Sequence, residues 1–295
     1  MLTFHVTDSN GQNVPDASIH VGFVYNETSV VECAGKTDAE GIFIAKGKTS
    51  YDIHYVINKE GHYQTSASLC FGKNLGNDVK NGKWKPWNPT IALTLKEKRN
   101  PIPMYVKSID IIVPRQNEAF GFDFQIGDLV APYGKGENVD MLLNCGGERP
   151  VPISHTVSRN LTLSFQNKGE GIMRENKYTP SRLVSLHEAS EGKYQSKIYF
   201  NYARTDEKIL EDNNFSKNEY LIFRTRVATD KDGKRIKSNY GKTYSIDYDI
   251  TGNPDTRARV SLCYYFNPTS NDRNLEFDTS KNLFGNDRRG NFFSP

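Results

Sequence analysis

Apolar side chains recur at every second position in stretch after stretch of this chain. In one of the clearest, Ile19, Val21 and Phe23 alternate with polar or small residues. Successive side chains of a β-strand point to opposite faces of a sheet, so this period of two predicts strands buried on one face. Several such strands along one chain favour a mainly antiparallel, all-β fold. The other stretches with this period span residues 4–6, 51–57, 91–95, 109–113, 161–165, 198–202, 221–227, 244–250 and 260–266.

Helical patterns are scarce by comparison. Only residues 181–190 and 206–213 fit helices, and both helices would be short. Glycine, asparagine and aspartate separate the alternating stretches and supply the chemistry of tight turns. The chain has 295 residues, which is enough for one large β domain or two smaller ones with proper cores.

The first 68 residues place turn-forming residues between their alternating stretches. Asp8 precedes Gly11, and Asp38 precedes Gly41, each time by three positions. Glycine accepts the positive φ angle that such a turn requires, and the aspartate side chain caps the turn. The residues run VTDxxGxxVPxAxIxV, then GKTDAEGIF, then YxIxYVINKEGHY. This pattern resembles the carboxypeptidase regulatory-like, or transthyretin-like, β-sandwich module, which implies a fold and is nearly silent on function.

A boundary between two domains is expected near residue 98. Residues 96–103 combine a charge run with a Pro-x-Pro sequence, which is typical of a linker. The first domain, residues 1–98, is then a transthyretin-like or Ig-like sandwich, and the second, residues 99–295, a larger β domain built as a jelly-roll or sandwich. Within it, NPIPMYVK, GFDFQIGDLVAPYGKG, LSFQNKGEGI and YYFNPTSNDRNLEFDTSKNLF are similar to segments of uncharacterised bacterial or phage proteins, which implies architecture and no activity.

Charge, hydropathy and cysteine spacing argue against several classes of partner. The chain carries 38 basic and 35 acidic residues, a net charge of +3, so no nucleic-acid partner is expected. No apolar run approaches the ~20 residues that cross a bilayer, and the N-terminus has no apolar leader, so neither membrane insertion nor a signal peptide is expected. The four cysteines form no CxxC pair, and a Cys33–Cys70 disulfide within the first domain is left open.

No catalytic constellation stands out in the sequence. There is no GxSxG motif and no serine or cysteine in a recognisable histidine context, so we expect no enzyme, no cofactor and no metal. Paired carboxylates for glycoside hydrolysis are an open alternative, because such partners can be remote in the chain. The glycine-rich stretch 121–140 contains Asp123, Asp128, Glu137 and Asp140. Calcium ligation is one interpretation, but the EF-hand spacing is absent and the capping of inter-strand turns is favoured.

Aromatic residues outside the alternating stretches are the candidates for binding a ligand or partner. Trp84 and Trp87 lie among prolines in a long loop, where an indole ring can stack on a sugar or anchor a protein interface. They can equally fold back over the junction between the two domains. Tyr133, in the glycine-rich stretch, is a further candidate. Phe292 and Phe293, near the end of the tail, are expected to dock onto a neighbouring subunit.

The leading hypothesis from these features is a non-enzymatic component of a phage virion, such as a tail, collar or capsid-decoration protein. Its partners would be other subunits of the particle, in an oligomer, and it would be made in the host cytoplasm. The first alternative is a bacterial carbohydrate- or surface-binding protein in the cytoplasm or, if a leader was removed, at the cell surface. A host-surface glycan is the alternative ligand, and a glycan-active hydrolase is the third hypothesis.

Overall fold

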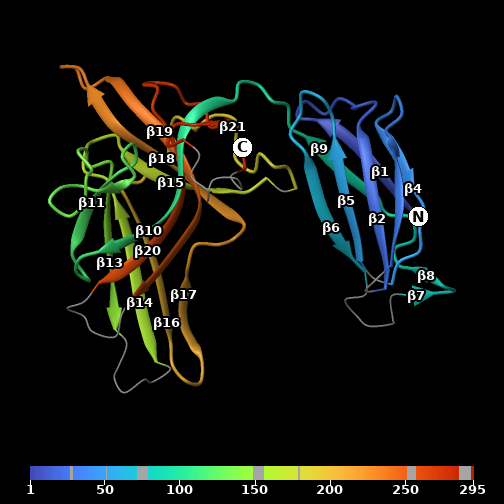
Figure 1. The fold of residues 1–295 in the computed structure, drawn as a ribbon, viewed down its shortest axis with the longest axis horizontal. Helices are drawn as coiled ribbons and strands as arrows, with labels where there is room; N and C mark the ends of the chain where they lie inside the picture. Colours follow the sequence, from blue (N-terminus) through green and yellow to red (C-terminus); the bar gives the residue numbers. More distant parts are fainter. Residues whose placement is uncertain are drawn as a thin grey trace. The chain divides into compact units, whose positions relative to one another are not determined.

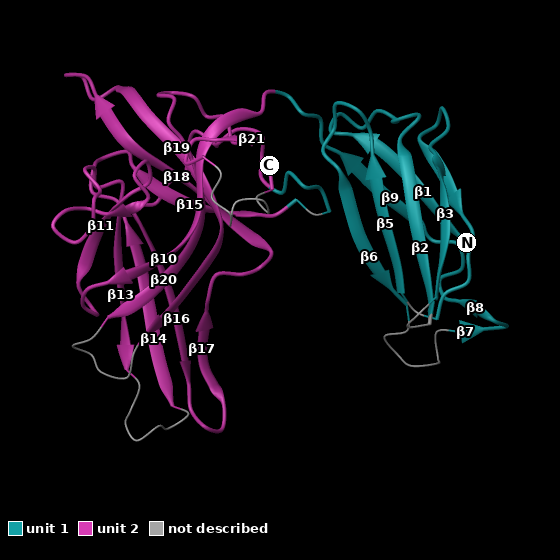
Figure 2. Cartoon of the chain, in the orientation of Figure 1, with its two compact units in different colours: residues 1–99, 178–184 teal, residues 100–177, 185–295 magenta. Residues whose placement is uncertain are grey.

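The computed structural model of the chain describes residues 1–26, 29–50, 52–71, 79–148, 156–178, 180–250, 257–285 and 294–295 (Figure 1). The chain divides into two compact units (Figure 2). The first unit comprises Met1–Arg99 with Tyr178–Val184, and the second comprises Asn100–Lys177 with Ser185–Pro295. Every regular element among the described residues is a β-strand, which confirms the predicted all-β class. No helix within the described ranges has the length and apolar character needed to cross a membrane.

The first unit is a sandwich of two small sheets that enclose one core. The sheet orders are β4-β1-β9 and β3-β2-β5-β6, and neighbouring strands are antiparallel except for β1 and β9. The alternating residues Ile19, Val21 and Phe23 are buried and share the core with Phe4 and Val6. The strands are β1 (Leu2–Asp8), β2 (Ser18–Asn26), β3 (Ser29–Lys36), β4 (Ile42–Ala45), β5 (Asp52–Asn58), β6 (Thr65–Cys70) and β9 (Thr90–Leu95).

Two turns of the first unit are built as their residues predict. The Oδ1 atom of Asp38 accepts a hydrogen bond from the Ile42 N–H at 2.7 Å, and Asp8 Oδ1 accepts one from the Gln12 N–H at 2.9 Å. Gly41 has a φ of +72°, and a Cβ atom at this position would lie 2.4 Å from a backbone carbonyl oxygen. The turn therefore requires glycine both for its φ angle and for the close approach of the neighbouring strand.

The second unit is a larger sandwich of two six-stranded sheets. The sheet orders are β15-β18-β19-β20-β10-β21 and β12-β11-β13-β14-β16-β17, with β10 and β21 parallel. Both sheets contribute to one core, in which Phe223 of β18 stacks on Phe124 with ring centroids 4.1 Å apart. The strands are β10 (Ile102–Val113), β11 (Ala119–Asp123), β12 (Asp128–Leu129), β13 (Met141–Glu148), β14 (Val157–Ser164), β15 (Gly171–Asn176), β16 (Lys197–Arg204), β17 (Ile209–Asn213), β18 (Glu219–Thr229), β19 (Arg235–Ile250), β20 (Ala258–Asn267) and β21 (Phe277–Asn282).

Residues 96–103 do not form the free linker that their charges and prolines predict. The Lys96 side chain is buried, and its backbone oxygen accepts a hydrogen bond from the Tyr63 N–H at 2.8 Å. Its ammonium lies 4.3 Å from the ring centroid of Tyr178, and burial lowers its pKa to about 8. Strand β10 already begins at Ile102. The charged run therefore packs as part of the first unit, and little chain is left over as a linker.

Both predicted helices are wrong. In the stretch 181–190, Ser181 forms a β-bridge with Thr65 of β6, the edge strand of its sheet. In the stretch 206–213, strand β17 pairs antiparallel with β16. An unpaired strand edge offers N–H and C=O groups to any extended segment that reaches it. Pairing across the sheet therefore outweighs the weak local preference of these two short stretches.

All four cysteines are thiols, and the Cys33–Cys70 disulfide left open above does not form. Cys33 lies on β3 and Cys70 on β6, at opposite edges of the four-stranded sheet. Three strand spacings separate these edges, a distance of about 14 Å. A disulfide requires Cα atoms within about 7 Å of one another, so the sheet itself keeps this pair apart.

We expect Cys70 to be the thiol that reacts fastest with Ellman's reagent in the native protein. This side chain is exposed, whereas burial raises the pKa of Cys145 to about 12 and that of Cys263 to about 11. The thiolate is the reactive form, so Cys145 and Cys263, with their raised pKa values, react slowly. Cys70→Ser removes the fast phase, and the unfolded wild type titrates as four thiols. A count of two thiols after unfolding would show a disulfide and contradict the assignment.

Candidate functional site

A short hairpin, β7 (Val79–Lys80) and β8 (Lys83–Trp84), and the segment directly after it carry both tryptophans of the chain. Asn81 and Gly82 join its strands, with φ angles of +52° and +68°. Positive φ at both central residues is characteristic of a type I′ turn, for which Asn-Gly is a preferred pair. The first tryptophan ends β8, and Trp87 follows in the connection to β9. The Asn81–Gly82 turn thus helps to set the positions of both indole rings.

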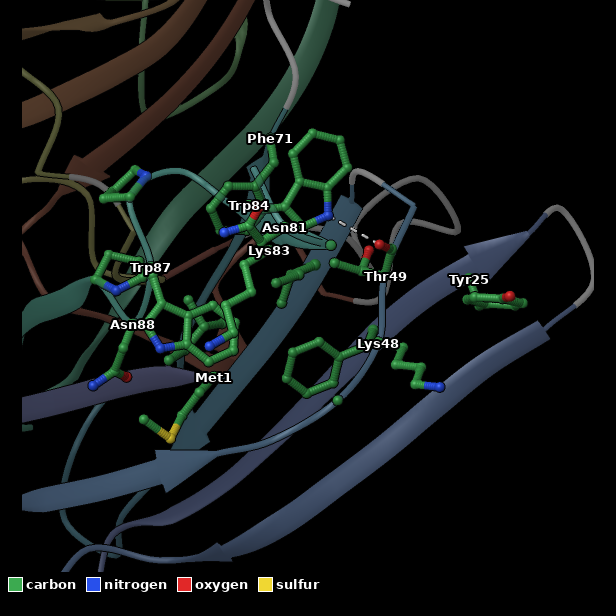
Figure 3. A pocket seen from close by; sticks show the side chains of 17 residues that line it. Met1, Tyr25, Lys48, Thr49, Phe71, Asn81, Lys83, Trp84, Trp87 and Asn88 are labelled. Carbon is green, nitrogen blue, oxygen red and sulfur yellow. Dashed lines mark hydrogen bonds between the residues drawn. The ribbon is translucent and has the colours of Figure 1, made fainter. Parts of the chain in front are cut away.

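The two indole rings are held differently. Trp84 is half-buried: its Nε1–H donates to the Thr49 carbonyl oxygen at 3.0 Å, and its ring stacks on Phe71 with centroids 6.0 Å apart (Figure 3). Trp87 is 51% exposed, and the Nζ atom of Lys83 lies 4.7 Å from its ring centroid. Trp84 is therefore fixed by the fold, whereas Trp87 presents aromatic surface to solvent.

Both rings line a pocket of about 450 Å³ at one end of the first sandwich (Figure 3). Phe23 of β2 and Ile53 of β5 bring core side chains to its wall. The rest of the lining comes from the first two residues, Tyr25, the loop between β4 and β5, Phe71, the hairpin and the segment after β8. All of these residues belong to the first unit. Pockets of this size and aromatic character are typical of sites for small ligands.

The polar part of the lining is rich in hydrogen-bond donors. Lys48 and Lys83 contribute ammonium groups, and Asn81 and Asn88 contribute side-chain amides. None of the described lining residues is Asp, Glu, His or Cys. Across the described part of the chain, no group of three or more His, Cys, Asp or Glu side chains is placed to hold a metal ion. What this pocket offers is aromatic surface and positive charge.

The sequence singles out the two tryptophans but not their neighbours in the pocket. Lys48 and Thr49 lie in the loop before β5, and Phe71 directly follows β6. Thr49 stands 35 positions from Trp84 in the chain. The signal for these residues is weak, because many loops lie at strand ends and the alternating pattern does not say which of them meet.

Comparison with known proteins supplies no identity. No family model matches the sequence, and neither does any curated protein. The likeness of the first 68 residues to the transthyretin-like module therefore rests on their motifs alone and stays a prediction.

Tyr133 belongs to the second unit and does not line the pocket. Its ring is 56% exposed and meets the ring of Phe120 edge-on, with centroids 4.9 Å apart. One face of the tyrosine is thus supported by the sandwich while the rest is open to solvent. The other described candidates, Trp84 and Trp87, belong to the first unit.

The tail residues Phe292 and Phe293 lie outside the described residues. The two residues that follow are described, and Pro295 is buried. Its carbonyl oxygen accepts a hydrogen bond from the Tyr244 hydroxyl at 3.2 Å. The end of the tail therefore contacts the second unit of its own chain, and docking of Phe292 and Phe293 on a neighbouring subunit stays a prediction.

The glycine-rich stretch 121–140 is organised around two buried carboxylates, those of Asp123 and Asp140. Asp123 accepts hydrogen bonds from the backbone N–H groups of residues 125, 126, 137 and 138. Arg226 joins the pair: its Nη2 lies 3.2 Å from Asp123 Oδ1, and its Nε lies 2.8 Å from Asp140 Oδ1. This geometry agrees with the capping role favoured from the sequence, but Arg226 was missed because its contacts lie about a hundred residues away in the chain.

Burial and hydrogen bonding act in opposite directions on these two carboxylates. Burial acts to raise the pKa of Asp123, but its backbone N–H donors lower that pKa on balance. Burial also raises the pKa of Asp140, and the guanidinium of Arg226 limits this rise. Buried charges of this kind are tolerated only when they are paired and hydrogen-bonded. The cluster therefore holds the loops of the second sandwich in place.

Proposed function

We propose that this chain is a non-enzymatic glycan-binding protein that holds a sugar in the Trp84–Trp87 pocket. The observation that carries the proposal is the pairing of two indole rings on one pocket, one of them fixed and one exposed. A flat aromatic ring supplies a large apolar contact with little loss of side-chain entropy, and it matches the apolar face of a pyranose. The side-chain amides of Asn81 and Asn88 add polar groups of the kind that fix a ligand's orientation.

The chemistry of the lining favours binding over hydrolysis. Most glycoside hydrolases place two carboxyl groups on either side of the scissile bond. The described residues that line this pocket supply neither of them. In the second unit, the carboxylates of Asp123 and Asp140 are fully buried and both pair with Arg226. Their role is therefore to stabilise the fold.

A glycan array probed with the labelled full-length chain tests the proposal. We expect saturable binding to at least one class of glycan, lost in the double variant Trp84→Ala/Trp87→Ala. Tyr133→Ala is the matched control, because it removes an exposed aromatic ring from the second unit. Its binding should equal that of the wild type. A wild type that binds no glycan would contradict the proposal, as would a double variant that binds equally well.

A second candidate is the structural role in a phage particle, as a tail, collar or capsid-decoration component. The observation that favours it is β17, an edge strand of the second sandwich whose five residues are all exposed. Ile209 and Leu210 are 58% and 55% exposed on that edge. A bare strand edge with apolar side chains is suited to adding a strand from another subunit.

Mass spectrometry of purified phage particles tests this second candidate. If the chain has this role, we expect its peptides in intact particles. Leu210→Lys should reduce incorporation of the chain, because a charge on the edge strand opposes strand pairing. Absence of the chain from particles would overturn the structural role. It would leave the glycan-binding proposal untouched, since that proposal rests on the first unit.

A further inference from the structure

The Trp84–Trp87 pocket is more basic than the chain around it. The described segments 42–50 and 79–95 supply the hairpin and loop residues of its lining, and they contain five lysines and no Asp, Glu or Arg. The whole chain, in contrast, has 38 basic and 35 acidic residues, close to balance. The lysines of the two segments are Lys46, Lys48, Lys80, Lys83 and Lys85.

Two of these ammonium groups are available to a ligand. Lys48 and Lys83 both line the pocket, and among the described residues neither forms an ion pair. Lys83 lies over the ring of Trp87, at 4.7 Å from the centroid. A sugar in contact with Trp87 would therefore have a positive charge beside it. Each lysine ammonium has three donors and no acceptor.

Several polar groups around the pocket already have partners within the fold. The Asn88 Oδ1 atom accepts a hydrogen bond from the Thr3 hydroxyl at 3.1 Å. The Thr49 carbonyl oxygen accepts from the Trp84 indole, and the Thr49 hydroxyl donates to Val24 O at 2.8 Å. The charged side chains of the lining, Lys48 and Lys83, are donors only, which match a ligand rich in negatively charged acceptor oxygens.

We infer that the ligand of this pocket is an acidic glycan, a sugar carrying a carboxylate, sulfate or phosphate group close to the ring that stacks on tryptophan. The inference rests on the proposed glycan-binding function and adds the charge of the ligand. In this arrangement the indole rings contact the sugar face, and Lys48 and Lys83 contact the anionic substituent. Attraction between these charges also speeds encounter and weakens as salt screens it.

Matched pairs of saccharides that differ only in the anionic group test the inference. Suitable pairs are oligogalacturonate with its methyl ester, 3′-sulfolactose with lactose, and mannose 6-phosphate with mannose. The dissociation constant of the full-length chain is measured for each at 50 and 300 mM NaCl. We expect the acidic member of at least one pair to bind roughly 10-fold tighter at low salt and to lose most of that preference at high salt. The three pairs distinguish carboxylate, sulfate and phosphate.

The double variant Lys48→Gln/Lys83→Gln is expected to reduce this preference for the acidic member to nearly one while neutral binding persists. Lys231→Gln/Lys234→Gln is the matched control, because it makes the same change of net charge in an exposed turn of the second unit. An equal loss in the control would mean non-specific attraction and overturn the inference. Equal binding of both members of every pair would also overturn it and leave the proposed function standing. Failure of the chain to bind any glycan on the array would overturn the proposed function itself.

Discussion

Replacing Arg226 with alanine is expected to lower the free energy of unfolding of the second unit by about 3–5 kcal/mol. The side chain is 20% exposed, while the two carboxylates that it joins, on Asp123 and Asp140, have no exposure. Its Nη1 also donates to Gln125 Oε1 at 2.6 Å, and its guanidinium lies 5.0 Å from the ring centroid of Phe266. Loss of the guanidinium leaves two buried negative charges without their partner, which costs more than the pair itself contributes.

The destabilisation should grow with pH. Burial raises the pKa of Asp140, and Arg226 limits that rise, so the alanine variant has a still higher pKa in the folded state. A carboxyl group with a raised folded pKa contributes stability at pH values below its unfolded pKa and loses it as pH rises through the folded value. The difference between wild type and variant is therefore smaller near pH 5 than near pH 8. A deficit that shrinks as pH rises would contradict the assignment.

Urea unfolding followed by two signals measures this effect. Both tryptophans lie in the first unit, so their emission follows that unit, whereas far-UV circular dichroism follows both units. Arg226→Ala should shift the dichroism transition and leave the tryptophan transition in place. Arg115→Ala is the control, because Arg115 and Glu118 form a surface pair that is 70% and 49% exposed. Such pairs contribute less than about 1 kcal/mol.

Trp87→Ala is expected to weaken glycan binding by roughly 30-fold, or about 2 kcal/mol, with no change in thermal stability. Half of the Trp87 side chain is open to solvent, so the fold loses little when it is truncated. The ligand, in contrast, loses a central aromatic contact. Trp87→Phe should restore part of the affinity, because it keeps a flat ring at the same position. Isothermal calorimetry with the strongest glycan from the array supplies the measurement.

Trp84→Ala is expected to weaken binding and also to lower the melting temperature of the first unit. It removes the hydrogen bond to the Thr49 carbonyl oxygen and the stacking contact with Phe71, and both contacts hold the hairpin to the sandwich. The contrast between the two tryptophan variants separates a ring that the fold positions from one that mainly contacts ligand. Equal stability losses in both variants would contradict this division.

The strands of this protein were predictable because their signal is local. Side chains two positions apart share a face, so the run from Ile19 to Phe23 reveals β2, and the run from Val260 to Phe266 reveals β20. The turn at Asp38 was equally accessible, since its capping bond and its glycine fall within four residues. For the same reason, Trp84 and Trp87 could be singled out as unusual residues in a loop.

The features that the sequence did not predict depend on contacts between distant parts of the chain. Residues 181–190 carry no local sign that Ser181 will pair with the edge of β6, more than a hundred positions earlier. Arg226 falls within a polar and apolar alternation that says nothing of the two aspartates it joins. The pocket likewise depends on loops brought together at one end of the sandwich. Sequence patterns therefore identified the elements and single residues, while three-dimensional pairing determined the site.

The most direct test of glycan binding in the Trp84–Trp87 pocket follows the two indole N–H resonances of the ¹⁵N-labelled chain. The chain has only Trp84 and Trp87, and both line the pocket, so each resonance reports on that pocket. Trp87→Phe assigns the two signals. On titration with the strongest glycan from the array, the account predicts that both resonances shift together and saturate at the calorimetric dissociation constant. A glycan that binds by calorimetry while both resonances stay in place would contradict the central claim.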